Sequence, residues 1–374
     1  MGESSNDKLV YNSFGHCIST TPLSLTEMVS WIYSVYFLTV FVLARGDELS
    51  GFIDMTGSRP GVAKGSQLFY WFTPAQEASV DAPLLIWLQG GPGSPGELGL
   101  FYEIGPYFLN NDLVLVNRTV GNWNKHYNVL FLDQPIGTGY STAGSESSYA
   151  TNEDDVATDL YFFLLKWYSL FGQFASAPLY LTGESYAGHY IPAFGHKILT
   201  ENDNIAQTGN PVIPLRGVAI GDGLTDPCSQ VEAGPRAAYD MGLINPKTFA
   251  RAKAIAVEAS VACARGDWRA AHDYREQMEG VVLSASGINK YDVRTFESYD
   301  ALTDRMDLFM NLPDTKKMLH VPLDVPFLTD DLVSTKLYED VMQSQMDKFP
   351  LLLERVRVLL YQVGRWGGGG GGSA

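Results

Sequence analysis

A serine flanked by glycines stands at a predicted strand-to-helix junction. The stretch LYLTGESYAGHYIPAF (179–194) joins a short apolar run to a segment that can be helical, with Ser185 between Gly183 and Gly188. Small flanking residues keep such a turn sharp, and the turn lifts the serine oxygen out of the sheet toward backbone N–H groups. Ala187 stands where a strict Gly-x-Ser-x-Gly pattern has its second glycine. The pattern predicts a nucleophile at Ser185, with a tight turn and a capping serine as the alternative.

A glycine cluster follows an earlier apolar run. The segment GGPG (90–93) comes at the end of the strand-like run 82–90. Glycines there permit the backbone to approach a ligand closely, so the cluster could supply an N–H group to an oxyanion. The alternative is a plain turn.

Two carboxyl groups and an amide complete the candidate residues. Gln89 precedes the glycine cluster, Glu184 precedes the serine, and Glu103 lies between these segments in the chain. If the two loops adjoin Ser185, the carboxyl groups meet, and one pKa rises because both cannot ionise easily in contact. A protonated pair could donate hydrogen bonds to a substrate carboxylate. If the loops do not adjoin, each glutamate is an ordinary solvated acid.

Strand-like apolar runs lead into these turns. They occupy residues 66–74, 82–90, 127–135, 177–183 and 215–223. A helical pattern with acidic residues in its first turn occupies residues 153–172. Short apolar strands separated by helices are typical of a mostly parallel sheet covered on both faces, so the sequence predicts the α/β class. In open sheets of this class, sites form at the carboxyl ends of the strands, where the candidate residues lie.

The composition and periodicity of the sequence change after Cys228. Residues 231–287 are rich in alanine and charge and have a helical period, which predicts a helical insertion, or cap. A strand-like run returns at 355–362. The glycine tail that follows can form no regular structure, because glycine loses the most entropy on ordering and has no side chain to pack.

Composition excludes some functions. The chain has 374 residues, 45% of them hydrophobic, which is enough for one large α/β domain with an insertion. Its net charge of −16 argues against nucleic acid as a partner, because phosphates require a basic face. Three cysteines are too few for a disulfide scaffold. Cys228 and Cys263 could form a disulfide if they meet in space, or could remain free and buried.

An apolar run near the N-terminus, residues 29–44, suits either the apolar core of a signal peptide or an uncleaved signal anchor. The anchor would be the protein's only contact with a membrane. Either interpretation sends the chain into the secretory pathway, to a vacuole or lysosome or to the extracellular space. The triplet Asn117-Arg118-Thr119 agrees with this, since it predicts N-glycosylation at Asn117.

Taken together, these stretches resemble the serine carboxypeptidase family, whose members have the α/β-hydrolase fold. The matching blocks, in chain order, are PLLIWLQGGPGSPGELGLFYEIGPY, NWNKHYNVLFLDQPIGTGYS, LYLTGESYAGHYIPAF and LRGVAIGDGLTDP. The resemblance covers roughly Leu49 to Tyr361, and the QGGPG and GDG variants are most similar to the vitellogenic-like branch. It implies a mostly parallel central sheet with a helical cap insertion.

The resemblance also implies roles in the removal of C-terminal residues from peptides. Ser185 would be the acylating nucleophile, and the N–H groups of Gly91 and Tyr186 would form the oxyanion hole. The residues implied to hold the terminal carboxylate of the substrate, at acidic pH, are Gln89, Glu103 and Glu184. The partners would be peptide or protein C-termini, and the family implies no metal and no cofactor.

A division of the chain follows from these observations. We expect a signal peptide or signal anchor at 1–47, the first part of the hydrolase core at 48–227 and the cap at 228–298. The core would continue over 299–363, and residues 364–374 would be a glycine-rich tail.

The sequence departs from the family pattern at the catalytic triad. The family's Asp follows the strand that matches residues 355–362, and its His comes later still. Here the last acidic residue is Glu354, and no histidine follows Tyr361. We therefore expect the triad Asp and His to be absent and the last strand or strands and a helix to be missing. Such a chain would be C-terminally truncated and inactive or nearly so. The residues SPG (94–96) also differ from those usual in the family.

Two alternative functions stay open at this point. The chain could be a non-catalytic pseudo-peptidase that holds peptide C-termini. It could also be a fragment of an acyltransferase, because acyltransferases share the scaffold.

Overall fold

The computed structural model describes residues 10, 11, 17, 18, 48–77, 82–289, 291, 300–328 and 331–362. The chain separates into two units, Met1–Ala44 and Arg45–Ala374. In the first unit, the described residues form two short antiparallel strands, β1 (Val10–Tyr11) and β2 (Cys17–Ile18).

Three stretches on which predictions were made lie wholly outside the described residues. They are the apolar run 29–44, the end of the predicted cap at 292–298, and the glycine tail 364–374. In the part of the chain that is described, no helix has the length and apolar character needed to cross a membrane.

The second unit is built on a seven-stranded sheet with the strand order β11-β10-β9-β5-β8-β4-β3. Its strands are β3 (Leu49–Asp54), β4 (Gln67–Thr73), β5 (Leu84–Leu88), β8 (Asn128–Leu132), β9 (Leu179–Glu184), β10 (Leu215–Gly221) and β11 (Arg357–Tyr361). Strands β5, β8, β9, β10 and β11 run parallel, and β4 and β3 add antiparallel pairs at one edge. The predicted α/β class with a mostly parallel sheet is confirmed.

Both faces of the central strands β4, β5, β8 and β9 are buried, which explains why these strands are largely apolar, whereas the edge strand β11 is mostly exposed. Along β4, Leu68 and Phe72 pack into a cluster that contains side chains of α2 and α3, while Phe69 and Trp71 pack into a second cluster on the opposite face. This alternation follows from the period of two along a strand. A strand with apolar residues at every position is therefore the expected sequence for this sheet.

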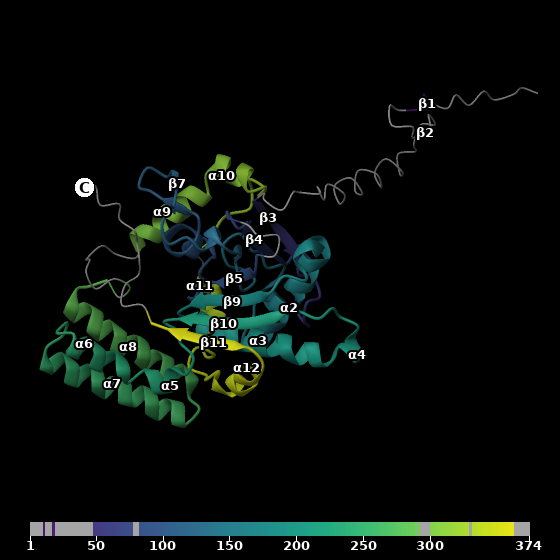
Figure 1. Cartoon of the computed structure of the whole chain (residues 1–374). Helices are drawn as coiled ribbons and strands as arrows, with labels where there is room; N and C mark the ends of the chain where they lie inside the picture. The colour runs from purple at the N-terminus through teal and green to yellow at the C-terminus, as the bar shows by residue number, and fades with distance from the viewer. Residues whose placement is uncertain are drawn as a thin grey trace, which may run out of the picture. The chain divides into compact units, whose positions relative to one another are not determined.

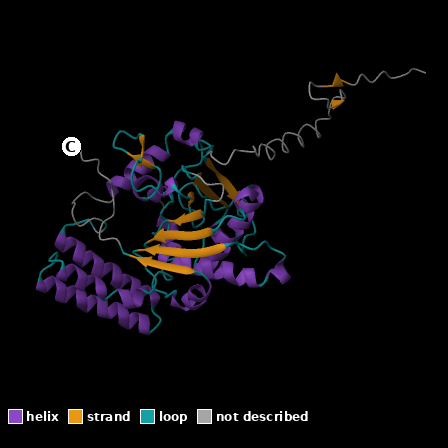
Figure 2. Cartoon of the chain, in the orientation of Figure 1, coloured by secondary structure: helices purple, strands orange, loops and turns teal. Residues whose placement is uncertain are grey.

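The remaining elements of the core cover the two faces (Figures 1 and 2). The helices are α2 (Glu153–Leu170), α3 (Ala187–Asp203), α4 (Ile205–Thr208), α9 (Asp300–Met310), α10 (Pro313–Met318), α11 (Asp331–Lys336) and α12 (Phe349–Arg355). A small hairpin is formed by β6 (Tyr107–Leu109) and β7 (Leu115–Asn117). The core also contains short helical segments. One is a π-helix, η1 (Gly99–Glu103), and the others are 3-10 helices: η2 (Trp123–Lys125), η3 (Glu146–Ser148), η4 (Gly172–Phe174) and η5 (Met346–Lys348).

A helical cap lies at the carboxyl ends of β9, β10 and β11 (Figure 1). Its helices are α5 (Pro227–Gln230), α6 (Ala233–Asp240), α7 (Pro246–Ala264) and α8 (Trp268–Ser286). Ala252, Ala256 and Ala259 recur at helical spacing on α7 and are fully buried, in one cluster with Met278 of α8. Their small side chains allow the two helices to pack closely, which explains the alanine-rich sequence here.

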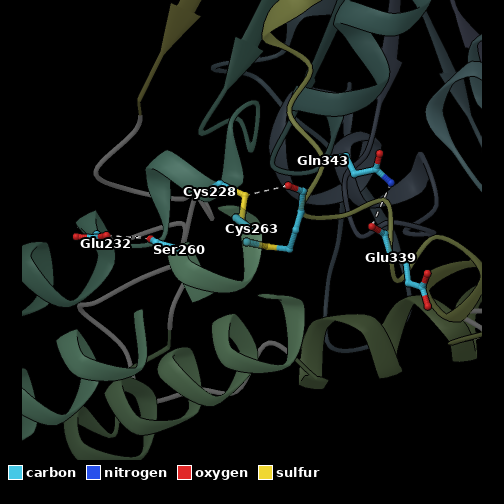
Figure 3. The surroundings of a disulfide bond; sticks show 7 residues. Cys228, Glu232, Ser260, Cys263, Glu339 and Gln343 are labelled. Carbon is cyan, nitrogen blue, oxygen red and sulfur yellow. Dashed lines mark hydrogen bonds between the residues drawn. A yellow bond between two sulfur atoms is a disulfide. The ribbon is translucent and has the colours of Figure 1, made fainter. Parts of the chain in front are cut away.

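A disulfide bond joins Cys228 on α5 to Cys263 on α7, with their Cα atoms 6.1 Å apart (Figure 3). The Cys228 sulfur also lies 3.2 Å from the Met342 carbonyl oxygen, which belongs to the core. The bond therefore fixes the first helix of the cap to its third and lies against the segment after α11. Disulfides persist in oxidising compartments, so this bond agrees with the expected passage through the secretory pathway, which stays a prediction.

Replacing both cysteines by serine is expected to lower the free energy of unfolding of the cap region by roughly 3–4 kcal/mol, because the bond closes a loop with a sequence separation of 35. Urea titration followed by intrinsic fluorescence measures the change. Ser260→Ala is the matched control on α7, since it removes only an exposed hydrogen bond to Glu232 (2.9 Å; Figure 3). Equal effects of the two changes would contradict the prediction.

Candidate active site

The turn from β9 into α3 places Ser185 at the carboxyl edge of the sheet. Ser185 has a φ of +57°, in the left-handed region that residues with a side chain seldom adopt. Its N–H donates to the Gly221 carbonyl (3.0 Å), and its carbonyl accepts from the N–H groups of Gly188 and Leu224 (2.9 Å each). These bonds tie the turn to the end of β10 and hold the strained residue in place. The geometry is that of a nucleophile elbow.

The glycines of the elbow are required by close backbone contacts. A Cβ atom on Gly183 would lie 2.2 Å from the Leu88 carbonyl oxygen, and one on Gly188 would lie 2.6 Å from the backbone nitrogen of Leu224. The Ala187 side chain is fully buried, and its Cβ would lie only 2.8 Å from a Cβ at position 183. The turn therefore tolerates alanine at 187 because glycine stands at 183.

The glycine cluster after β5 packs directly on the elbow. A Cβ atom on Gly90 would lie 2.8 Å from both the Ser185 Cβ and the Tyr186 backbone nitrogen. Gly91, with a φ of +113°, follows in the same loop, and it lines one cavity together with Ser185 and Tyr186. The structure thus places both residues predicted for the oxyanion hole beside the predicted nucleophile.

Three segments distant in the sequence bring Gln89, Glu103 and Glu184 together. The Gln89 Nε2 donates to Glu184 Oε1 (2.7 Å) and lies 3.2 Å from Glu103 Oε1. The Trp87 Nε1 donates to Gln89 Oε1 (2.8 Å). Because a tryptophan side chain can only donate, this bond fixes the orientation of the amide, with its NH₂ group facing both carboxyl groups.

Both carboxyl groups of this cluster have raised pKa values. Burial raises the pKa of Glu103 to about 8, although the Gln89 hydrogen bond and the Arg118 charge act in the opposite direction. Burial, followed by the charge of Glu103, raises the pKa of Glu184 to about 11. At acidic pH the two groups are therefore protonated, and each carries an O–H donor.

Two cavities meet at Ser185. One has a volume of about 580 Å³ and a polar lining that includes Asp222 and His272. The other has a volume of about 390 Å³, lies under α6 and α8, and has a mostly apolar lining that includes Met241 and Met278. Gln89, Glu103 and Glu184 belong to the lining of neither cavity. The carboxyl cluster is therefore separate from the two cavities, and Ser185 lines both cavities.

Five of the six histidines lie in the described residues. His189 is fully buried and stacks on Tyr186 with ring centroids 4.4 Å apart, and burial lowers its pKa to about 4. It is thus a packing residue on α3. His126 and His320 are exposed, and His196 is half-buried on α3.

His272 shares a cavity with Ser185, which the sequence did not reveal. Its Nδ1 lies 2.9 Å from the Tyr338 carbonyl oxygen, so Nδ1 carries the proton that this bond requires. Its Nε2 lies 3.5 Å from a Glu276 carboxylate oxygen. Both ring nitrogens therefore have neighbours within the cap and the 331–345 segment.

Sequence reasoning missed two further residues of the site. Trp87 orients Gln89, but its strand is buried on both faces, so the apolar pattern marked it only as core. Arg118 donates to the carbonyls of Phe101 (2.8 Å) and Gly105 (3.1 Å) and so supports η1, which carries Glu103. In the sequence, Arg118 is marked only as the middle residue of a glycosylation triplet, so its contact with η1 could not be predicted.

Asn117, the first residue of that triplet, lies at the end of β7 and is exposed. An exposed position is accessible to the modifying enzyme. Glycosylation at Asn117 stays a prediction.

A mostly parallel sheet with a strained serine between strand and helix, covered by a helical cap, defines an α/β hydrolase. The family model described as "Serine carboxypeptidase" matches residues 44–364. The chain therefore belongs to the serine carboxypeptidase family.

Individual relatives agree with this assignment. The chain is 36% identical over 301 residues to "Probable serine carboxypeptidase CPVL" of Dictyostelium discoideum, a match that covers 79% of this chain and 59% of that protein. It is 32% identical over 338 residues to "Vitellogenic carboxypeptidase" of Aedes aegypti, covering 86% of this chain and 67% of that protein. The chain thus spans about three fifths to two thirds of the length of these relatives.

A solved structure shows the same fold. The crystal structure of Kex1(delta)p, a prohormone-processing carboxypeptidase from Saccharomyces cerevisiae, superposes with a TM-score of 0.74. The match covers 84% of this chain and 73% of the other, at 24% sequence identity. At this identity the likeness concerns the fold.

Proposed function

We propose that this scaffold is built for the removal of C-terminal residues from peptides through an acyl-enzyme on Ser185. The observation that carries the proposal is the Gln89 amide held between Glu184 (2.7 Å) and Glu103 (3.2 Å), directly before the elbow. An amide and two protonated carboxyl groups offer several hydrogen-bond donors to one anion. A peptide's terminal carboxylate is such an anion, whereas an internal peptide bond is not.

The proposed reaction assigns each group one role. The Ser185 oxygen attacks the carbonyl of the last peptide bond, and the N–H groups of Gly91 and Tyr186 stabilise the negative charge that develops on its oxygen. Gln89, Glu103 and Glu184 hold the terminal carboxylate. A base takes the serine proton and gives it to the leaving nitrogen, so that the peptide C–N bond breaks as the Ser185 ester forms. Water then attacks the ester, which releases the shortened peptide as an acid and restores the serine hydroxyl.

The chemical steps need a base to take the serine proton. His189 is buried against Tyr186, and His272 has neighbours on both ring nitrogens. We therefore propose that the chain binds peptide C-termini but hydrolyses them slowly or not at all, because neither of these two histidines is placed to take the serine proton and a serine without a base reacts several orders of magnitude more slowly.

Two measurements test the proposed function. The chain is expected to bind a blocked dipeptide with a free carboxylate at acidic pH at least about tenfold more tightly than the matching amide, since charge-assisted hydrogen bonds are lost with the amide. Isothermal titration calorimetry measures both constants. Equal affinities would refute the role of Gln89, Glu103 and Glu184.

The second measurement concerns turnover. Blocked dipeptides are expected to remain intact at acidic pH, and a phosphonate serine probe is expected to leave Ser185 unlabelled by mass spectrometry. Stoichiometric labelling would show that another residue serves as base. In that event His272→Gln identifies the base, because it would abolish labelling if His272 activates the serine, and His126→Gln, at an exposed position, is the control.

A further inference from the structure

We propose that Glu97 and Asp133 form a proton-sharing carboxyl pair that positions the segment 91–103. This segment carries Gly91, proposed for the oxyanion hole, at one end and Glu103, proposed to hold the substrate carboxylate, at the other. Neither member of the pair lines either of the two cavities at the serine, so both are positioning residues. The inference rests on the proposed function, because it concerns how the peptide-binding segment is held.

The segment crosses the end of β8 in direct backbone contact. The N–H group of Gly96, the residue before Glu97, donates to Asp133 Oδ1 (3.1 Å), and Asp133 directly follows β8. A Cβ atom on Gly96 would lie 2.8 Å from both the backbone nitrogen and the backbone oxygen of Leu132. The Asp133 carboxyl group therefore holds the middle of the segment, between the glycine cluster and η1.

The carboxyl group of Asp133 is enclosed by protein. Glu97 and Asp133 are each only 1% exposed. The Tyr140 N–H group donates to Asp133 Oδ2 (2.8 Å), and a Cβ atom on Gly139 would lie 2.1 Å from the same oxygen. The backbone of the turn 133–140 thus closes over this carboxyl group. A charge enclosed in this way is stable only if protein donors satisfy it.

Glu97 supplies the third donor to Asp133. Its carboxyl group is hydrogen-bonded to that of Asp133, and a bond between two carboxyl groups requires that one of them carries a proton. Burial, followed by the charge of Asp133, raises the pKa of Glu97 well above its ordinary value of 4.5. Burial raises the pKa of Asp133 only to about 6, because hydrogen bonds from Glu97, Tyr140 and Gly96 stabilise its charge. Glu97 therefore keeps the proton and donates the hydrogen bond when Asp133 is ionised.

The pair has no counter-ion in the part of the chain that the structure describes, because no lysine, arginine or histidine there contributes to the pKa shift of either carboxyl group. A further titratable group, Tyr140, faces the pair. Burial, followed by the charges of Glu97 and Asp133, raises the pKa of Tyr140, so its hydroxyl stays neutral, and it donates to the Met310 carbonyl. Glu97 Oε2 has no hydrogen-bond partner, which a neutral acid tolerates better than a carboxylate. A shared proton is therefore what prevents two buried negative charges at this point.

Glu97→Gln tests the shared proton. The amide keeps the shape of the acid and a donor for Asp133, but it cannot ionise. Above about pH 4.5 the unfolded chain releases the Glu97 proton while the folded chain keeps it, so this residue makes stability fall as the pH rises. Urea titrations between about pH 5.5 and 8 are expected to show that the variant takes up about one proton fewer on folding than the unaltered chain. Glu258→Gln, at an exposed position on α7, is the matched control and should leave proton uptake unchanged.

Glu97→Met tests the positioning. Methionine is similar in size but donates no hydrogen bond, so it leaves the Asp133 charge with two donors instead of three. At about pH 6.5 Asp133 is largely ionised, whereas Glu103, whose pKa is about 8, is still protonated. There the amides of segment 91–103 are expected to exchange hydrogen at least about tenfold faster than in the unaltered chain at the same pH, and a free-acid dipeptide is expected to bind at least about tenfold more weakly. At about pH 5 both differences should shrink to about twofold or less, since Asp133 is then protonated.

The conservative variant provides the rescue. Glu97→Gln should match the unaltered chain in exchange and in binding at both pH values, because its amide still donates to Asp133. Mass spectrometry measures the exchange, calorimetry measures the binding, and circular dichroism verifies that the variants are folded.

The outcomes separate this inference from the proposed function. Equal defects of Glu97→Met at both pH values would mean that Glu97 only fills space, and unchanged proton uptake in Glu97→Gln would mean that the pair shares no proton. Either result overturns the inference, and so do unaltered exchange and binding in Glu97→Met. If the unaltered chain binds acid and amide peptides equally, the carboxylate site is refuted, while exchange and proton uptake still decide whether the pair holds the segment.

Discussion

Gly183→Ala is expected to lower the free energy of unfolding by about 3 kcal/mol and to displace the serine elbow. The new Cβ would lie 2.2 Å from the Leu88 carbonyl oxygen and 2.8 Å from the Ala187 Cβ. The first neighbour is backbone in the middle of the sheet, so it cannot rotate away. In the native register Gly183 is paired with Leu88 across β9 and β5, and separating them breaks the ladder directly before Ser185.

The measurement is a urea titration together with calorimetric binding of a free-acid dipeptide. The variant should show both a lower midpoint and weaker binding, because Glu184 and Ser185 follow the altered residue. Gly172→Ala is the matched control. Gly172 is exposed, has nothing within 4 Å of its Cβ, and should change stability by no more than about 0.5 kcal/mol. A Gly183→Ala variant as stable as the control would show that the strands can separate without loss.

The second large effect concerns pH. Peptide binding through the free carboxylate is expected to be strong near pH 5 and to fall by at least about tenfold as the pH rises through about 8, the pKa to which burial raises Glu103. Below that value the carboxyl cluster donates hydrogen bonds to the ligand. Above it the cluster gains a negative charge, which repels the ligand and removes a donor. The amide form of the same peptide should show no such dependence.

Stability should follow the same direction. The pKa values of Glu103 and Glu184 are raised in the folded state above the ordinary value of 4.5. Their contribution is therefore fully present below about pH 4.5 and is lost as the pH rises through the folded-state values. Buried carboxyl groups elsewhere act in the same sense, since burial also raises the pKa of Asp133 to about 6 and of Asp340 to about 7. The contribution of the carboxyl cluster to the pH dependence of stability must therefore be measured with a variant in which one of its carboxyl groups cannot ionise.

Glu103→Gln provides that variant, because Glu103 is the group whose pKa lies at about 8. The amide has the shape of the carboxyl group, keeps a donor and cannot ionise. Its unfolding midpoint and its peptide affinity should both depend less on pH than those of the unaltered chain. Glu354→Gln, at an exposed position, should leave both profiles unchanged. If Glu103→Gln has the same pH profile as the unaltered chain, ionisation of this cluster does not control binding.

The main structural features could be predicted from local sequence. The runs that become β4, β5, β8, β9 and β10 are apolar because both faces of the sheet are covered there. They could therefore be predicted as strands, in their order along the chain. Ser185 could be selected because a sharp turn between strand and helix restricts the residues around it. The alanine-rich period of α7 and α8 likewise indicated a helical cap. These signals are local, since each depends on neighbours within one or two turns of chain.

Other properties depend on contacts between distant segments, and only the tertiary structure decided them. The sequence left open whether Cys228 and Cys263 pair, because pairing depends on how α5 and α7 pack. It left open whether Glu103 meets Glu184, and it gave no sign that Trp87 orients the amide between them. Hydrogen bonds and pKa shifts arise from burial and from neighbours in space. The sequence by itself therefore determined the family, the sheet and the serine, while the carboxyl cluster and the cavities around the serine were decided by the packing of the folded chain.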